Sequence, residues 1–340
     1  MSSFTKSLKR AVNFDESVLL ISLIGIIITL SFLSPYFMTG ENVINILRQS
    51  SITLIAGIGI TVLLLVGEVD LSIGSLAAFV GIFTVKSLNY SKSIFVAIMV
   101  GLAIGCIVGW VNSFIVTKFN INSLIVTLGM MSILRGTGYI STNAVAVQNQ
   151  VPQFTQIGTG YAGPFPIPVI IAFALFGVFY FILKYTTFGR YIYASGGNAK
   201  AAVASGINVR TVKTVCFLIC STLAALSAVI MTSRVNSGQP NLALGFEMTV
   251  IAAAILGGTS LAGGQGSLLG TLVGILILGV LENGMVLLDV STFYQDVVRG
   301  AVIIIAVILD TRRSAGMGKT NKIKCVPKAS PTKSSVGEVK

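Results

Sequence analysis

Two carboxylates, Glu68 and Asp70, and the hydroxyl of Ser72 stand in a short polar segment between two apolar runs. If these runs cross a membrane, a carboxylate that faces lipid at mid-bilayer costs about 2.5–3.5 kcal/mol. We therefore expect Glu68 and Asp70 to lie at an interface, in a cavity or in a contact with a partner. A structural alternative, compatible with a subunit contact, is that Asp70 or Ser72 caps the following helix.

Other polar side chains fall within or beside apolar runs, at Asn112, Thr127, Arg234, Glu247 and Glu282. Asn112 and Thr127 are candidates for the lining of a polar path. An intramembrane carboxylate such as Glu282 indicates a functional site by default, although a hydrogen bond between helices explains it equally well. Arg234 and Glu247 bracket one loop and are candidates for an ion pair.

The residue types that are missing exclude several chemistries. The chain has no histidine, which rules out Ser-His-Asp catalysis, histidine-ligated zinc and histidine proton relays. Its four cysteines show no CxxC spacing, and Cys216 and Cys220 lie one helical turn apart in an apolar run, where small buried side chains are expected. We predict no catalytic residue, no metal, no cofactor and no disulfide framework, so an intramembrane enzyme is disfavoured.

The elements that must position these residues are membrane-spanning helices. Of the 340 residues, 54% are hydrophobic and 10% are charged, whereas soluble domains carry about 25% charged residues. The 36 glycines fit helices that pack closely in lipid. We predict an all-α integral membrane protein with about ten spans of roughly 20 residues each. The predicted spans lie near residues 17–34, 51–66, 74–89, 94–117, 122–140, 166–183, 211–232, 248–260, 267–288 and 294–310.

The distribution of Lys and Arg predicts that both termini are cytoplasmic. The two terminal segments supply most of that signal, but one contrast between loops supports it separately. Residues 141–165 contain no Lys or Arg, whereas residues 184–213 contain five. The first loop is therefore placed outside and the second inside. The predicted location is the cytoplasmic membrane.

The terminal segments divide the chain into a cytoplasmic N-terminus (residues 1–16), a transmembrane domain (17–310) and a basic disordered tail (311–340). Basic residues before the first apolar run imitate a signal peptide, yet no small-residue cleavage site follows, so we expect an uncleaved span. Eight of the 23 Lys and Arg follow Asp310, within a net charge of +12. Attraction of this tail to anionic lipid explains the charge better than nucleic-acid binding does.

The predicted cytoplasmic stretch 187–209 combines a short amphipathic helix with glycine turns. Small residues on a helix face permit close docking into a groove of another protein. A helix that lies on the membrane surface is the alternative, and the residues alone do not decide between them. The positions concerned are Gly189, Arg190, Gly196, Gly197, Asn198, Ala202 and Gly206, with turns expected at 188–190, 196–198 and 206–208.

A second glycine-rich connection, residues 256–266, aligns weakly with residues 66–75. Such a match is typical of transporters built from internal repeats, and both connections are predicted to face the cytoplasm. Residues 261–265 imitate the signature of ABC ATPases, and residues 318–320 imitate the end of a phosphate-binding loop. That loop needs a glycine where this chain has Arg313, so we predict no ATP site.

Four segments together resemble the ribose-type branch of ABC importer permeases: residues 67–75, 123–129, 188–208 and 256–266. The resemblance runs from about residue 40 to residue 310 in the family's order. It departs from the family at Glu68, where many members have a glycine, and at Asn122, where a proline is usual. Since Asn also starts helices well, the local bend is expected to survive.

This resemblance implies the ten-helix importer permease fold and a transport subunit that catalyses no covalent chemistry. The implied partners are ABC ATPase subunits, an extracytoplasmic solute-binding protein and a second permease, identical or paralogous. Residues 187–209 would be the coupling region that docks the ATPase, and the solute would be a sugar such as ribose. The residues expected in the path or at subunit contacts are Glu68, Asp70, Ser72, Asn112, Thr127, Glu247 and Glu282.

A rival from another class is a stand-alone secondary transporter driven by ions. It would use Asp70, Glu247 or Glu282 as a titrating carboxylate. Transport that persists without an ATPase would favour this rival.

Overall fold

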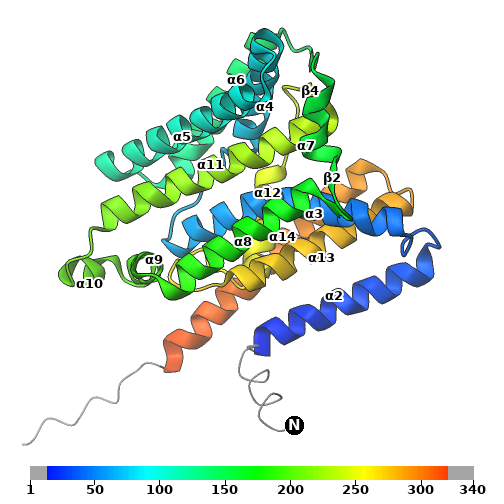
Figure 1. Cartoon of the computed structure of the whole chain (residues 1–340). Coiled ribbons are helices and arrows are strands. Elements are labelled where there is room, and N and C mark those ends of the chain that lie inside the picture. The colour runs from blue at the N-terminus through cyan, green and yellow to red at the C-terminus, as the bar shows by residue number, and fades with distance from the viewer. Residues whose placement is uncertain (1–13, 321–340) are drawn as a thin grey trace, which may run out of the picture.

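Long apolar runs form the helices that make up most of the chain, and Figure 1 shows them running side by side in one bundle. The structure, a computed structural model, describes residues 14–320. The long helices are α2 (Phe14–Leu33), α3 (Gly40–Leu65), α4 (Ile73–Ser91), α5 (Ile94–Phe119), α6 (Ser123–Thr142), α8 (Ile167–Tyr185), α11 (Val209–Val235), α13 (Leu268–Leu287) and α14 (Thr292–Thr320).

Seven helices of the described chain are long and apolar enough to cross a membrane: α3, α4, α5, α6, α8, α11 and α13. The prediction of a helical, multi-span protein is therefore confirmed, whereas the count of about ten is not. The segment predicted at 248–260 forms only α12 (Phe246–Leu256). Its 11 residues extend about 16 Å at 1.5 Å per residue, which is short of the roughly 30 Å of a hydrocarbon core.

Short elements gather at the two ends of the bundle (Figure 1). At one end lie the 3₁₀ turn η1 (Pro152–Thr155), α7 (Gln156–Thr159) and two short pairs of strands. Strand β1 (Val147–Gln148) pairs antiparallel with β4 (Ser237–Gly238), and β2 (Tyr161–Ala162) pairs with β3 (Phe165–Pro166). The opposite end carries α9 (Thr187–Gly197) and α10 (Ala199–Ala204). The described chain also begins and ends toward this second end.

Local sequence explains most of the helix boundaries. Helix α3 begins at Gly40, earlier than the predicted residue 51, because the Thr39 side chain accepts a hydrogen bond from the Asn42 backbone N–H. The Asn122 side chain accepts from the Leu124 N–H at 2.8 Å, which confirms that asparagine starts α6. The predicted turn at 188–190 is wrong, because Thr186 caps α9 and those residues form its first turn. Helix α14 extends to Thr320, while the remaining tail lies outside the described residues.

Helices α3 and α11 form the centre of the bundle, and α5 packs along α11 through a row of glycines. Gly101, Gly105 and Gly109 follow one another at four-residue spacing on the buried side of α5. A Cβ added at Gly105 would lie 2.7 Å from the Ser221 carbonyl oxygen, and one at Gly109 would lie 2.8 Å from the Phe217 carbonyl oxygen. The small residues therefore bring the two helix backbones into direct contact.

This contact predicts that Gly105→Ala lowers the melting temperature of the purified protein. Overpacking of a tight contact costs about 1–3 kcal/mol. Gly177→Ala in α8 is the matched control, because a Cβ there meets nothing within 4 Å and alanine favours a helix. Thermal unfolding in detergent compares the two variants. Equal melting temperatures would contradict the proposed close packing.

Candidate functional site

The connection between α3 and α4, residues 66–72, places a buried carboxylate among helices. Asp70 has no exposed surface. Its Oδ1 accepts hydrogen bonds from the Ser72 backbone N–H at 2.8 Å and from the Ser72 hydroxyl at 2.6 Å. Its Oδ2 accepts from Asn112 of α5 at 3.5 Å and from Ser221 of α11 at 3.4 Å. Three of the predicted site residues, Asp70, Ser72 and Asn112, are thus brought together.

The alternative prediction, that the side chain of Asp70 or Ser72 caps α4, is wrong. Ser72 occupies the position before α4, but its side chain makes no capping hydrogen bond. Asp70 instead binds the N–H two residues ahead of it, in a local turn that precedes the helix. Asp70 therefore ties the start of α4 to α5 and α11 rather than capping α4.

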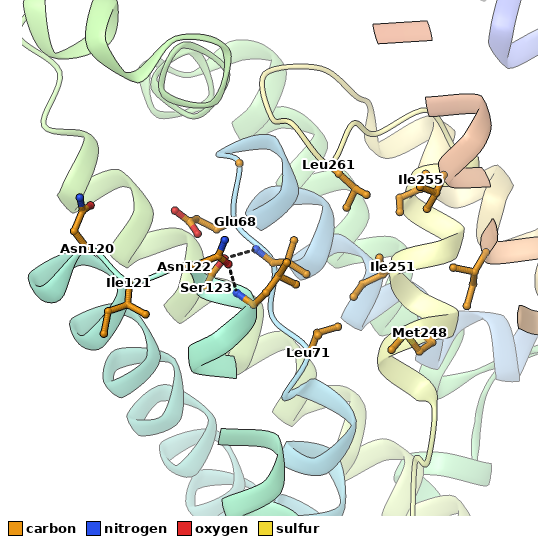
Figure 2. Close-up of a pocket in the computed structure, with 15 residues that line it drawn as sticks. Glu68, Leu71, Asn120, Ile121, Asn122, Ser123, Met248, Ile251, Ile255 and Leu261 are labelled. Atoms are coloured by element: carbon orange, nitrogen blue, oxygen red, sulfur yellow. Dashed lines mark hydrogen bonds between the residues drawn. The ribbon is translucent and has the colours of Figure 1, made fainter. Parts of the chain in front are cut away.

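A cavity of about 610 Å³ lies beside this connection (Figure 2). We call it the inner cavity because it lies toward the end of the bundle that carries α9. One side of it carries polar groups, and the other side carries aliphatic side chains from α12 and the loop after it. The lining residues are Gly67, Glu68, Val69, Leu71, Asn120, Ile121, Asn122, Ser123, Leu124, Met248, Ile251, Ile255, Leu261, Ile303 and Val307.

The first turns of α6 hold the wall of this cavity in place. The hydroxyl of Ser123 accepts a hydrogen bond from the Val69 N–H at 3.2 Å, and that of Thr127 accepts from the Leu71 N–H at 3.1 Å. Thr127 is fully buried and does not line this cavity, so within this chain it supports the wall. The carboxylate of Glu68, which does line the cavity, forms an ion pair with Lys213 of α11.

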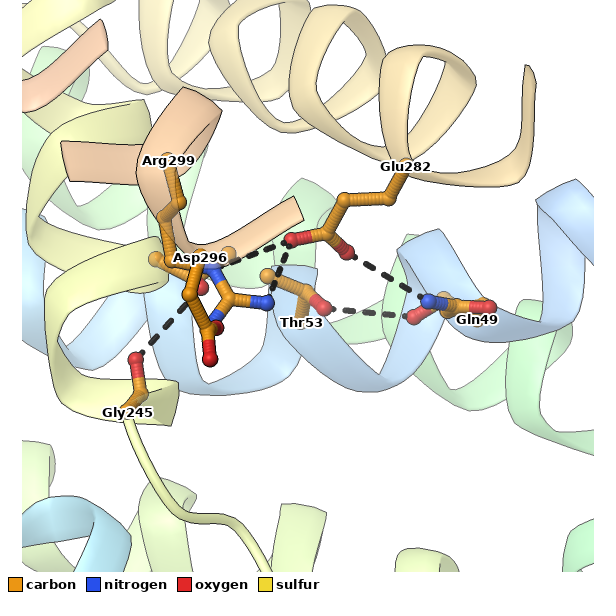
Figure 3. A network of polar contacts seen from close by, with 7 residues as sticks. Gln49, Thr53, Gly245, Glu282, Asp296 and Arg299 are labelled. Atoms are coloured by element: carbon orange, nitrogen blue, oxygen red, sulfur yellow. Dashed lines mark hydrogen bonds and ion pairs between the residues drawn. The ribbon is translucent and has the colours of Figure 1, made fainter. Parts of the chain in front are cut away.

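A smaller cavity of about 290 Å³ lies on another side of α12. We call it the outer cavity because it lies farther from the end that carries α9 (Figure 1). Glu282 of α13 borders it and accepts hydrogen bonds from Arg299 of α14 at 3.2 Å and from Gln49 of α3 at 3.5 Å (Figure 3). Arg299 also pairs with Asp296 at 2.9 Å. Among the described residues, Phe246 carries the only aromatic ring that borders either of these two cavities.

The expected ion pair between Arg234 and Glu247 is absent from the described residues. Arg234 has Arg48 as its charged neighbour, whereas Glu247 interacts electrostatically with Arg135 and Arg299. Glu247 is buried and lies against Gly74 of α4. It therefore helps to hold the outer end of α12 between α4, α6 and α14.

Helices α12 and α14 border both cavities. From α12, Thr249 faces the outer cavity and Ile251 faces the inner one. On α14, Arg299 borders the outer cavity, and Ile303, one helical turn later, borders the inner one. These two helices thus connect a charged outer chamber with a largely aliphatic inner chamber.

Five glycines join the inner cavity to the end of the bundle that carries α9. We call this set the glycine junction: Gly67, Gly196, Gly197, Gly263 and Gly264. Within it, the Gly264 N–H donates to the Leu65 carbonyl at 2.8 Å. A Cβ added at Gly263 would lie 2.9 Å from the Gly67 Cα and 3.1 Å from the Gly196 Cα. The connection between α3 and α4 and the loop after α12 both line the inner cavity, and both meet α9 here. The backbones of these three segments therefore form one contact.

Comparison with known proteins gives these features a context. Residues 42–307 match the family described as the branched-chain amino acid transport system / permease component. The chain belongs to this permease family.

Several curated relatives cover most of both chains. The chain is 41% identical over 302 residues (88% of this chain, 94% of the relative) to the ribose import permease protein RbsC of Escherichia coli K12. Identity is 40% over 294 residues (85% and 91%) to the protein of the same name from Haemophilus influenzae. It is 38% over 290 residues (84% and 84%) to the L-arabinose ABC transporter permease protein AraH of Azospirillum brasilense. No solved structure matches the chain.

Membership of the permease family and the seven long apolar helices make the chain a multi-pass protein of the inner membrane. Permeases of ABC importers work with ATPase and binding-protein partners in general. Among residues 14–320, no group of three His, Cys, Asp or Glu side chains could hold a metal ion.

The residues predicted for coupling divide into two groups in the permease structure. Arg190, Gly197, Asn198 and Gly206 are exposed, whereas Gly189 and Ala202 are buried and Gly196 is half-buried against Leu65 and Gly264. Asn198 caps α10 by accepting from the Ala201 N–H at 3.0 Å. The first group is available to a partner, while the second fixes the position of α9 and α10.

Three residues that sequence reasoning missed complete the site: Tyr193, Lys213 and Arg299. The Tyr193 hydroxyl donates to the Gly266 carbonyl at 3.0 Å, and burial raises the pKa of this phenol, which keeps it protonated. A lone aromatic or basic residue within a helix carries no pattern that distinguishes it in sequence. Only the proximity of Lys213 to Glu68 and of Arg299 to Glu282 reveals their roles.

The buried Asp70 cluster predicts that Asp70→Leu destabilises the permease. The change leaves several buried donors unpaired, at a cost of about 1–3 kcal/mol each. Asp70→Asn should be milder, because its amide oxygen still accepts from Ser72. Thermal unfolding in detergent should rank wild type above Asp70→Asn and Asp70→Asn above Asp70→Leu, with the exposed Asp289→Asn as control. An unchanged melting temperature for Asp70→Leu would refute the assigned role.

Proposed function

We propose that the chain is the membrane-spanning permease subunit of an ABC importer for a monosaccharide, ribose or a related sugar. The observation that carries this proposal is the 40–41% identity, over most of both chains, to ribose import permeases. The solute passes between this chain and a second permease, identical or paralogous. A separate ATPase supplies the energy, and the chain itself catalyses no covalent reaction.

The two cavities support a path along α12 and α14. The outer cavity offers charged and amide groups for first contact, and the inner cavity offers a mixed polar and aliphatic surface. Helix α6 carries many apolar side chains on its exposed face, among them Ile125, Ile133 and Ile140. We assign this face to lipid and to the second permease.

We assign the opposite ends of the bundle to different partners. The exposed small residues of 197–206, with Val203 61% exposed, form the surface for the ATPase. The solute-binding protein docks on the outer loops 141–165 and 235–247. Pairing between Val147 and Gly238 joins these two loops into one surface.

ATP binding would act on the path through the glycine junction. Closure of the ATPases pulls on α9 and α10, and the Gly264–Leu65 hydrogen bond passes that movement to residues 67–71 and to Leu261. The inner cavity then opens toward one side of the membrane at a time. Two of the three acidic residues named for the ion-driven rival have structural partners instead: Asp70 is held by Ser72 and Asn112, and Glu282 by Arg299. The third, Glu247, is buried, and among the described residues its Oε2 has no hydrogen-bond partner.

Purification of the tagged chain in mild detergent, followed by mass spectrometry of bound proteins, tests this function. A P-loop ATPase should copurify, and replacement of residues 197–204 by a charged linker should abolish its recovery. ATP-dependent uptake of D-ribose into proteoliposomes should require that ATPase. Recovery of the chain alone, with uptake in ATP-free vesicles, would refute the importer and support the ion-driven rival.

The junction predicts that Gly263→Ala leaves the ATPase bound but lowers the amount of solute transported per ATP by about tenfold. The substitution adds a Cβ to a left-handed residue (φ +86°) and crowds two backbones. A weakening of about 1.4 kcal/mol corresponds to that factor. Gly163→Ala is the matched control, since it shares the left-handed backbone (φ +62°) without any neighbour within 4 Å. If both variants transported the same amount of solute per ATP, the proposal that the junction transmits ATPase closure to the cavity would be contradicted.

A further inference from the structure

The inner cavity contains one carboxylate, Glu68, whose two oxygens have different surroundings. One oxygen forms the ion pair with Lys213. The other, Oε2, accepts no hydrogen bond from any residue in the range 14–320 that the structure describes. Glu68 is 8% exposed and lines the cavity. An acceptor is therefore available where a solute would pass.

Hydrogen-bond donors accompany this acceptor on the same wall. Asn122 uses its amide oxygen to cap α6, so its NH₂ group remains for a ligand. Ser123 accepts from Val69 through its hydroxyl oxygen, which leaves the hydroxyl proton to donate. Because each hydroxyl group of a ligand is both a donor and an acceptor, a wall with both kinds of group suits a polyhydroxy compound.

The opposite wall is aliphatic, formed by Met248, Ile251, Ile255 and Leu261 (Figure 2). A ligand that fills the cavity must present hydroxyl groups on one side and C–H groups on the other. The Glu68–Lys213 pair has no net charge, which favours an uncharged ligand. A monosaccharide or polyol has both properties.

The ion pair by itself offers little to stability. Lys213 is 26% exposed at its side chain, so water weakens the attraction between the two charges. A role in fixing the direction of the carboxylate accounts better for a lysine at this position. Lys213 is then a positioning residue, and Glu68 is the group that contacts the ligand.

We propose that Glu68 binds hydroxyl groups of the transported solute in the inner cavity, with Lys213 holding its carboxylate toward the polar wall. This proposal rests on the proposed function and specifies a solute contact within it.

Exchange of the two charges separates a binding role from a structural one. The double variant Glu68→Lys/Lys213→Glu restores the ion pair but moves the carboxylate from the cavity wall to α11. The comparison also includes Glu68→Ala, the isosteric Glu68→Gln and Lys213→Met, with the exposed Glu41→Ala as control. Uptake of D-ribose and of L-arabinose is measured in proteoliposomes with the ATPase and saturating loaded binding protein, beside ATP hydrolysis and melting temperature.

Glu68→Ala should lower solute transport by about tenfold or more, the effect of losing a hydrogen bond to a charged group. Its ATP hydrolysis and melting temperature should stay close to those of wild type. The exchanged variant should not recover transport, whereas Glu68→Gln and Lys213→Met should retain part of it. The control variant Glu41→Ala should transport solute as well as wild type does.

Three results would overturn the assignment. Recovery of transport in the exchanged variant would make the pair structural, and unchanged transport in Glu68→Ala would leave Glu68 without a solute contact. An equal fall in melting temperature in Glu68→Ala and in Glu68→Gln would also assign the ion pair to stability. Failure of the wild-type complex to take up either sugar would instead refute the proposed function, and with it this contact.

Discussion

The arrangement of the inner half of the permease depends on a direct contact between glycine backbones. At the glycine junction, the ends of α3 and α9 and the loop after α12 meet so closely that a single added Cβ would overlap a neighbouring backbone. The Gly264–Leu65 hydrogen bond fixes the register of this contact. Because the same segments continue into Glu68 and Leu261, the shape of the inner cavity follows from the position of α9.

Burial of polar groups is the second constraint, and the permease meets it differently in three places. Asp70 is surrounded by donors from its own turn and from two neighbouring helices, so it costs little and remains fixed. Glu282 and Arg299 neutralise each other at the outer cavity. Glu68 is satisfied on one side alone. This difference separates a carboxylate that supports the fold from one that is available to a ligand.

The sequence predicted the helices well and the contacts between them poorly. Apolar runs define α4, α5 and α8 to within a few residues, because lipid exposure demands continuous hydrophobicity. Helix α12 ends at Leu256 because Gly258 takes up a left-handed conformation (φ +89°). Gly257 packs against the backbone of Gly270, and no apolar pattern encodes that contact. Likewise, Glu68 and Asp70 are two residues apart in sequence, yet one lines a cavity and the other is fully enclosed.

Helix α12 shows why these constraints belong together. Its outer end is held among charges, with Glu247 facing Arg135 and Arg299, while its inner end is held by the glycine contact with α13. Different residues of this one short helix border the outer and the inner cavity. In a transporter that alternates access, an element between two chambers must respond to both of them. A short helix held by charges at one end and by backbone packing at the other meets this requirement, since either contact can change without unfolding a full span.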